Sequence, residues 1–324
     1  MRVLLSLAGA ACLALTGLPA LADPPPPASP RPSAAPPAAV PPNDGDPRFT
    51  PGRPALPGTA SVVRERWTGP RMLDLLVSSP ATGRLVPVRL LLPPGWSKTD
   101  RIRTWPVLYL LHGRADNYTA WTRMSDVAAM TEGVEAIVVM PDAGRDASYA
   151  DARWAAFHTR ELRRLLEREY RAGRRRAVAG QGEGGYGALA YATAIPALFR
   201  FAGAYGGPLT GPGTGGDPLV LAPRLRGLGV YLAGEEAGAI SRRLGALGIE
   251  HTLSPARPAS WPAWNRAFAS SFPMILTALG LPGGGPASEL PETPDAAAGP
   301  APGIPDAVPP APLPLGVLPS AQGG

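Results

Sequence analysis

Residues 176–191 read RAVAGQGEGGYGALAY, and this stretch decides how the chain is organised. The small apolar residues at 177–179 lead into Gly180, and a helix-compatible segment begins near Tyr186. Glycine lets a backbone turn sharply and approach a neighbouring element closely. The stretch therefore predicts a buried strand, a tight turn and a helix in direct succession.

The two ends of the 324-residue chain differ in composition from its centre. Residues 1–22 contain one arginine, an apolar run and a final Ala-Leu-Ala, which is the pattern of a secretory signal peptide. Residues 23–58 are rich in Pro and Ala, and residues 282–324 in Pro, Gly and Ala. Neither segment can bury enough apolar surface to offset its ordering entropy, so we expect both to be disordered. Residues 59–281 remain, enough for one well-buried domain.

The composition excludes several classes of function. Cys12 is the only cysteine and lies in the predicted signal peptide, so we expect neither disulfides nor thiol catalysis in the mature protein. The net charge of +6 is modest, and the sequence has no zinc-type spacing, phosphate loop or aromatic–basic interleaving. We predict no metal, no cofactor and no nucleic-acid partner. The expected location is secreted or cell-envelope associated, with no transmembrane anchor after signal cleavage.

Predicted strands and helices alternate through residues 59–281. Residues 72–77 and 85–92 flank a turn cluster and predict an antiparallel hairpin. Further strands are predicted at residues 106–112, 136–140, 176–179, 201–205, 228–233 and 250–253, and helices at 125–130, 154–170, 186–194, 240–247 and 261–279. Pro273 is expected to break or kink the last helix. This order predicts an α/β fold with a mostly parallel central sheet and helices on both faces.

Four sequence runs together resemble a known family. They are YLLHGRADNYTAWTR (109–123), VVMPDAGRDASYAD (138–151), AVAGQGEGGYGALAYA (177–192) and GIEHTLSPARPASWPAWNRAF (248–268). They are similar to the secreted esterases and mycolyltransferases related to the antigen 85 proteins and to esterase D. The resemblance implies a single α/β-hydrolase domain without a cofactor, and acyl transfer or ester hydrolysis by a Ser–acid–His triad. It also implies an oxyanion hole of backbone N–H groups, one just after the nucleophile and one near the His-Gly turn.

The catalytic side chains that the resemblance implies are missing at their positions. The nucleophile of the G-x-S-x-G pattern falls on Gly182, and the family histidine falls on Ala259. The acid falls in a loop where Glu235 or Glu236 could take its place. Ester hydrolysis needs a nucleophilic oxygen and a base within hydrogen-bond reach, which glycine and alanine do not supply. We therefore predict a non-catalytic pseudoenzyme that acts by binding.

A ligand pocket is predicted beside the turn, at the positions where the resembled family contacts its substrate. The expected pocket residues are His112, Gly113, Arg114, Trp121, Ser148, Gln181, Glu183 and Trp261. The Glu183 side chain is expected to point away from the catalytic position. The predicted ligand is an envelope glycan, a glycolipid or a protein.

Two other functions stay open. An active carboxylesterase or acyltransferase with a relocated nucleophile would need a base, and the chain's histidines are His112, His158 and His251. At each of these three positions a structural histidine is the favoured interpretation. A structural cell-envelope protein with Pro-rich spacers would need no ligand site at all.

The segment from residue 160 to residue 176 carries eight arginines. A solvated face, with Glu161 and Glu167 as partners at i,i+3 and i,i+4 spacing, is the favoured interpretation. A docking surface for an anionic envelope polymer or for lipid headgroups is the alternative.

Overall fold

A computed structural model describes residues 49–51 and 58–283, apart from residues 148, 212, 214 and 255–258. The predicted signal peptide, nearly all of the Pro/Ala-rich linker and nearly all of the Pro/Gly/Ala-rich tail lie outside the described residues. Those three assignments stay predictions. Within the described residues, no helix combines the length and apolar character needed to span a bilayer.

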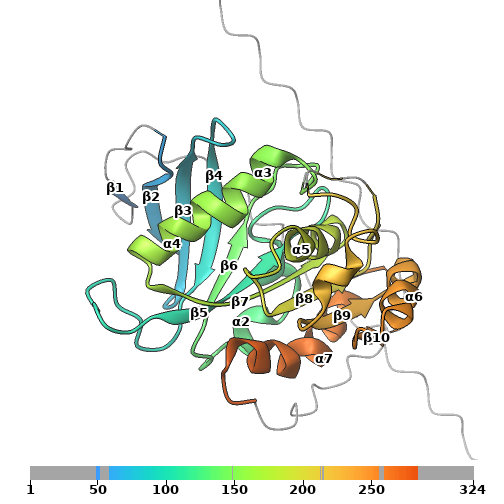
Figure 1. Cartoon of the computed structure of the whole chain (residues 1–324). Coiled ribbons are helices and arrows are strands. Elements are labelled where there is room, and N and C mark those ends of the chain that lie inside the picture. The colour runs from blue at the N-terminus through green and yellow to red at the C-terminus, as the bar shows by residue number, and fades with distance from the viewer. Residues whose placement is uncertain are drawn as a thin grey trace, which may run out of the picture. The chain divides into compact units, whose positions relative to one another are not determined.

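The described strands form one mixed sheet (Figure 1). In chain order they are β1 (Phe49–Pro51), β2 (Ser61–Trp67), β3 (Met72–Ser79), β4 (Arg84–Leu91), β5 (Trp105–Leu111), β6 (Ile137–Pro141), β7 (Ala172–Gln181), β8 (Phe201–Tyr205), β9 (Gly229–Ala233) and β10 (Thr252–Ser254). In space the order is β1-β2-β3-β4-β6-β5-β7-β8-β9-β10. Neighbours from β1 to β6 along this order pair antiparallel, and neighbours from β6 to β10 pair parallel.

Helices cover both faces of this sheet, as predicted. They are α1 (Ala120–Met124), α2 (Val127–Met130), α3 (Ala152–Ala156), a π-helix (Phe157–Leu162), α4 (Arg163–Glu169), α5 (Glu183–Ala194), α6 (Gly238–Ala246) and α7 (Trp261–Leu279), with short 3-10 turns at Ala222–Leu225 and Glu235–Ala237. One core cluster joins the sheet to the helices from α3 to α6. The other joins its opposite face to α1, α2 and α7.

Strand β5 shows how the sequence produces two buried faces. Val107, Tyr109 and Leu111 belong to the core under α5, whereas Leu108 and Leu110 belong to the core under α7. Successive side chains of a strand point to opposite faces, so a continuous apolar run is buried on both sides. All five side chains are at most 4% exposed.

The predicted hairpin is confirmed as β3 and β4, which pair antiparallel from Met72–Leu91 to Ser79–Arg84. Pro273 does not break the last helix, because α7 runs without interruption through this residue, and the alternative expectation of a kink stays a prediction. Pro273 removes one helical hydrogen bond. The buried residues Phe268 and Ile275 pack on either side of it, and this packing supports the helix across the missing bond.

The segment predicted as a single helix from 154 to 170 contains a π-helical stretch around His158, a widened turn that is often found at functional sites. The His158 ring is buried: Nε2 donates to the Asp142 carbonyl at 2.9 Å, and Nδ1 accepts from the Tyr191 hydroxyl at 2.8 Å. Burial lowers the pKa of His158 from 6.5 to about 4.

We predict that His158 makes the fold less stable as the pH falls from 6.5 to about 4. In this window the unfolded chain binds a proton at His158 and the folded chain does not, so unfolding is favoured. The loss is on the order of 3 kcal/mol and is absent at pH 7, where the ring is neutral in both states. Urea unfolding at pH 7 and pH 4.5 measures it. His158→Gln should flatten the pH dependence, and an unchanged slope would contradict the assignment.

Candidate functional site

The turn between β7 and α5 has the backbone geometry of a strained strand-to-helix elbow. Gly182 sits at its apex with φ 55° and ψ −127°, and its N–H donates to the Tyr205 carbonyl at 3.1 Å. A Cβ at this position would meet only the Gly113 Cα, at 3.7 Å. The apex is therefore open to a side chain, although its conformation is one that L-residues rarely adopt.

The glycines around the apex allow several backbones to pack closely. A Cβ on Gly184 would lie 2.3 Å from the Leu111 carbonyl oxygen, and one on Gly180 would lie 2.2 Å from the Gly184 carbonyl oxygen. A Cβ on Gly207 would lie 2.4 Å from the Gly182 carbonyl carbon. These distances are too short for any side chain, so β5, the elbow and the loop after β8 meet only because the three positions are glycine.

Glu183, the first residue of α5, holds the loop after β5. Its Oε1 accepts from Arg114 Nε at 2.7 Å, and its Oε2 accepts from the Arg114 backbone N–H at 3.0 Å. Burial raises the pKa of the Glu183 carboxyl, but hydrogen bonds from Arg114 and from its own backbone N–H hold it below the usual value. The expectation that this side chain points away is wrong. Its carboxylate sits on the two N–H groups that the family resemblance implies for an oxyanion hole.

Asp116 is a second carboxylate at this site and lies one turn after the His-Gly pair. Its Oδ2 accepts from Gln181 Nε2 at 3.0 Å, and its Oδ1 is 3.5 Å from Arg123 Nη2. Burial raises the pKa of the Asp116 carboxyl, while the charge of Arg123 and hydrogen bonds from the Trp261 and Gln181 side chains offset part of this increase. Asp116 belongs to the turn of residues 114–117, which the sequence predicts, together with Trp121, at the mouth of the pocket.

His112 and Gln181 are buried, each at most 2% exposed. The His112 Nε2 accepts from the Ala143 N–H at 2.9 Å, so its Nδ1 carries the proton and donates to the Gly113 carbonyl at 2.8 Å. The Gln181 side chain occupies the space beside Gly113 that a Cβ would need. The hydrogen bonds of His112 and the packing of Gln181 against Gly113 therefore hold the His-Gly turn in place from the buried side.

Trp121 is also buried, at 1% exposure, and packs edge-on against Trp261 with ring centroids 5.3 Å apart. Its indole N–H donates to the Leu111 carbonyl at 3.0 Å. The structure thus places Trp121 in the core and not at the pocket mouth. Of the predicted pocket residues, those that reach the surface are Arg114, Glu183 and Trp261. Ser148 lies outside the described residues.

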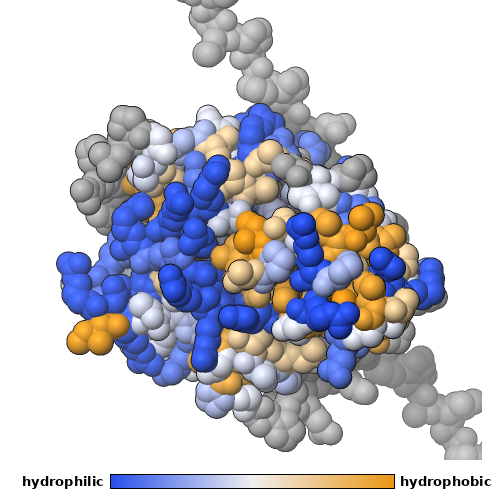
Figure 2. Space-filling model, in the orientation of Figure 1, coloured by the Kyte–Doolittle hydropathy of each residue, from blue (hydrophilic) through white to orange (hydrophobic). Residues whose placement is uncertain are grey.

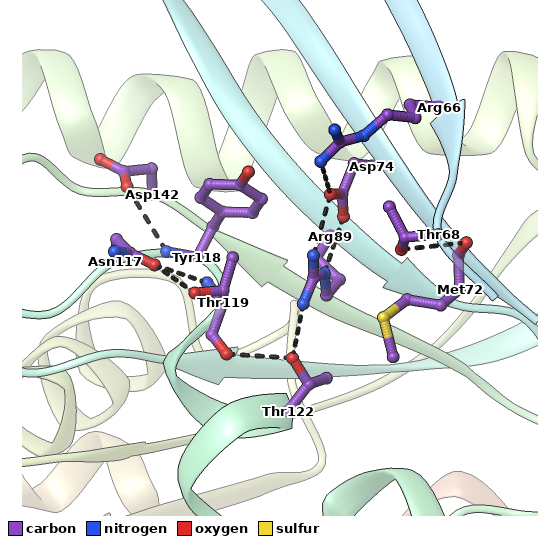
Figure 3. A network of polar contacts seen from close by, with 10 residues as sticks. All are labelled: Arg66, Thr68, Met72, Asp74, Arg89, Asn117, Tyr118, Thr119, Thr122 and Asp142. Atoms are coloured by element: carbon purple, nitrogen blue, oxygen red, sulfur yellow. Dashed lines mark hydrogen bonds and ion pairs between the residues drawn. The ribbon is translucent and has the colours of Figure 1, made fainter. Parts of the chain in front are cut away.

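A network of polar side chains anchors the segment that follows the His-Gly turn (Figure 3). Arg89 donates two hydrogen bonds to Asp74, from Nε at 2.7 Å and from Nη2 at 2.9 Å, and a third to the Thr122 hydroxyl at 2.7 Å. The Thr122 hydroxyl donates to the Thr119 carbonyl at 3.0 Å, and the Thr119 N–H donates to the Asn117 side chain at 2.9 Å. A mostly buried, bidentate ion pair holds its two side chains in a defined relative orientation. The network therefore ties this loop to β3 and β4.

The remaining triad positions carry no base. Ala259 is exposed two residues before α7, and its methyl group binds no proton. Glu235 and Glu236 lie in the exposed 3-10 turn after β9, where the acid is expected. His251 bonds Ser241 through Nε2 at 2.7 Å and the Ile249 carbonyl through Nδ1 at 2.9 Å. His251 therefore links α6 to the segment just before β10 and has no contact with the elbow among these hydrogen bonds.

No group of three or more His, Cys, Asp or Glu side chains suited to a metal ion occurs in the part of the chain that the structure describes. The site therefore consists of backbone donors, two carboxylates, a guanidinium and an indole ring.

Residues 79–217 match the Esterase family model. An esterase of Mycobacterium tuberculosis is 31% identical over 159 residues, which is 45% of this chain and 34% of that protein. The matched segment is thus similar to esterases, and the fold of the chain is that of an α/β-hydrolase. It spans about a third of the length of the curated relatives that it matches, so their complete architecture does not carry over.

Solved structures support the same fold. An S-formylglutathione hydrolase from Agrobacterium tumefaciens superposes with a TM-score of 0.56 at 14% identity, over 67% of this chain and 99% of that chain. The Mycobacterium tuberculosis protein MPT51 superposes with a TM-score of 0.51 at 21% identity, over 63% of this chain and 97% of that chain. At these identities the likeness concerns the fold alone. The finer placement near the antigen 85 proteins and esterase D stays a prediction.

Proposed function

We propose that this esterase-family protein does not hydrolyse esters and instead acts in the cell envelope or outside the cell by binding a glycan. The observation that carries the proposal is the elbow itself. Gly182 holds the apex geometry and has no side chain. Acyl transfer begins with attack by a nucleophilic oxygen, and the apex supplies none.

The oxyanion position supports the same proposal. An esterase stabilises the negative oxygen of its transition state with preorganised N–H groups. Here a permanent negative charge, the Glu183 carboxylate, already accepts from the Arg114 N–H, and its own N–H stabilises it as well. A substrate carbonyl would have to displace a carboxylate that also bonds the Arg114 guanidinium.

The accessible side chains of the site favour a hydroxylated ligand. Asp116 offers a half-buried carboxylate next to the partly exposed Trp261 ring, and Arg114 exposes most of its side chain. Carboxylate and guanidinium groups bond sugar hydroxyls, and an indole face packs against the apolar face of a sugar ring. An envelope glycan, alone or as part of a glycolipid, therefore suits the site better than an acyl ester.

One observation favours an active enzyme with a relocated nucleophile. The Ser241 hydroxyl and the His251 imidazole lie within hydrogen-bond distance, as a serine nucleophile and its base do. The other His251 nitrogen meets the Ile249 carbonyl and not a carboxylate. The pair therefore lacks an acid, and the alternative is tested below.

We predict that the native chain does not hydrolyse p-nitrophenyl butyrate and that activity can be restored stepwise. Gly182→Ser with Ala259→His should fold, with a loss of about 1–3 kcal/mol because a side chain at the apex is strained. Adding Glu183→Ala should raise kcat/KM of this double variant on the order of 10²-fold, since it frees the N–H groups for the transition state.

Steady-state assays with fluorophosphonate labelling measure these activities, and Glu183→Ala alone serves as the control without a nucleophile. Turnover by the native chain that disappears in Ser241→Ala would overturn the proposal and support the relocated nucleophile. An equally inert triple variant would instead mean that the acid position is lost as well.

We also predict that Asp116→Ala with Trp261→Ala reduces binding of the full chain to envelope polysaccharide at least about tenfold, because both side chains contact the sugar in this proposal. Trp67→Ala is the matched control, since Trp67 on β2 is also partly exposed, at 44%, and lies far along the sheet. Sedimentation with insoluble envelope polysaccharide measures the binding. Equal loss in the control, or none in either variant, would favour a structural protein without a ligand site.

A further inference from the structure

An open groove lies at the far end of α5 from the elbow. Its volume is about 590 Å³, within the range of roughly 300–1,000 Å³ that small-molecule sites usually have. One wall is the continuous helical segment of α3, the π-helix and α4, and the other is the chain just after α5. The α5 helix has 12 residues, or about 18 Å of rise, so the groove is separate from the elbow.

The groove changes character along its length. At one end its helical wall consists of the small residues Ala152, Ala155 and Ala156, and the facing wall carries Ile195 and Leu198. The Ile195 side chain is 40% exposed, so it presents apolar surface to the groove. Alanines leave space that longer side chains would fill, so this end is an apolar hollow.

At the other end the helical wall is cationic, with Arg160, Arg163 and Arg164. Figure 2 shows this contrast as a hydrophilic strip over α4 beside an apolar area between α4 and α5. The residues of both ends repeat at i, i+3 and i+4 spacing, which places them on one helix face. The helical wall is therefore apolar at its N-terminal end and positively charged at its C-terminal end.

Of the two glutamates expected to pair with arginines of this solvated face, Glu167 does so and Glu161 does not. Glu161 does not bond Arg164; it accepts from the Ser79 hydroxyl at 2.6 Å and from the Ala81 N–H at 2.9 Å. Glu167 bonds Arg163 at 2.9 Å and also bonds Arg176. Among the described residues, Arg160 and Arg164 form no ion pair. Two exposed positive charges at the rim therefore lack a counter-charge from this part of the chain.

We propose that this groove binds a single-chain anionic lipid, with its acyl chain along the alanine wall and its anionic headgroup at Arg160 and Arg164. Guanidinium groups form charge-assisted, often bidentate, hydrogen bonds with carboxylate and phosphate. The acyl chain would cover the exposed Ile195 side chain and remove apolar surface from water. The acyl chain and the headgroup would therefore both contribute to the binding free energy. This binding site is independent of the glycan site and of the catalytic status of the elbow.

Isothermal titration calorimetry of the full chain with dodecanoate, below its critical micelle concentration, tests the proposal. We expect binding at one site that weakens as salt is added. Arg160→Gln with Arg164→Gln should weaken binding at least about tenfold. Arg242→Gln with Arg243→Gln, which removes the same charge from the exposed face of α6, should leave it within about twofold.

Each half of the ligand is tested separately. Ala156→Phe, or Ala152→Phe at a more exposed position, fills the hollow and should abolish binding while both arginines remain, with the fold checked by circular dichroism. Dodecyl maltoside, with the same chain and no charge, and inorganic phosphate, with no chain, should both bind at least about tenfold more weakly. The proposal is overturned if dodecanoate does not bind, if both arginine double variants weaken binding alike, or if the phenylalanine variants bind normally.

Discussion

The contact between α5 and the end of β5 is the constraint on which the site depends. Gly184 brings the first turn of the helix so close to the Leu111 and His112 carbonyl oxygens that no Cβ fits between them. This contact holds the elbow against the end of β5 and the His-Gly turn that follows it. It also places Gly182 at the apex in a conformation that glycine adopts without strain. The geometry of the elbow is thus a consequence of backbone packing and does not require a side chain at residue 182.

The backbone N–H groups at the elbow and the following turn bind a carboxylate of the protein itself, that of Glu183. Two converging N–H groups at a helix start attract negative charge, and a transition-state oxygen uses them only briefly. In this chain a side chain that belongs to the protein takes the position permanently and, through Arg114, closes the loop onto the helix. Asp116 and Trp261 remain accessible beside them.

Much of the fold could be predicted because its signals are local. The apolar run of β5, the five residues of β8 and the turn cluster between β3 and β4 each carry their own pattern. What the sequence could not provide was contact between distant segments. Glu183 meets a residue 69 positions away, and Glu161 meets one 82 positions away, so neither side chain's direction follows from helical spacing. For the same reason the predicted break at Pro273 does not occur, since packing from both sides supports the helix across it.

Intact-mass spectrometry after incubation with an activated acyl ester tests the central claim most directly. The claim is that no side chain of this protein becomes acylated by catalytic attack. We predict that the mass of the native chain stays unchanged under conditions where Gly182→Ser with Ala259→His and Glu183→Ala gains one acyl group at residue 182. A stoichiometric, turnover-dependent adduct on the native chain, at Ser241 or at any other side chain, would contradict the account.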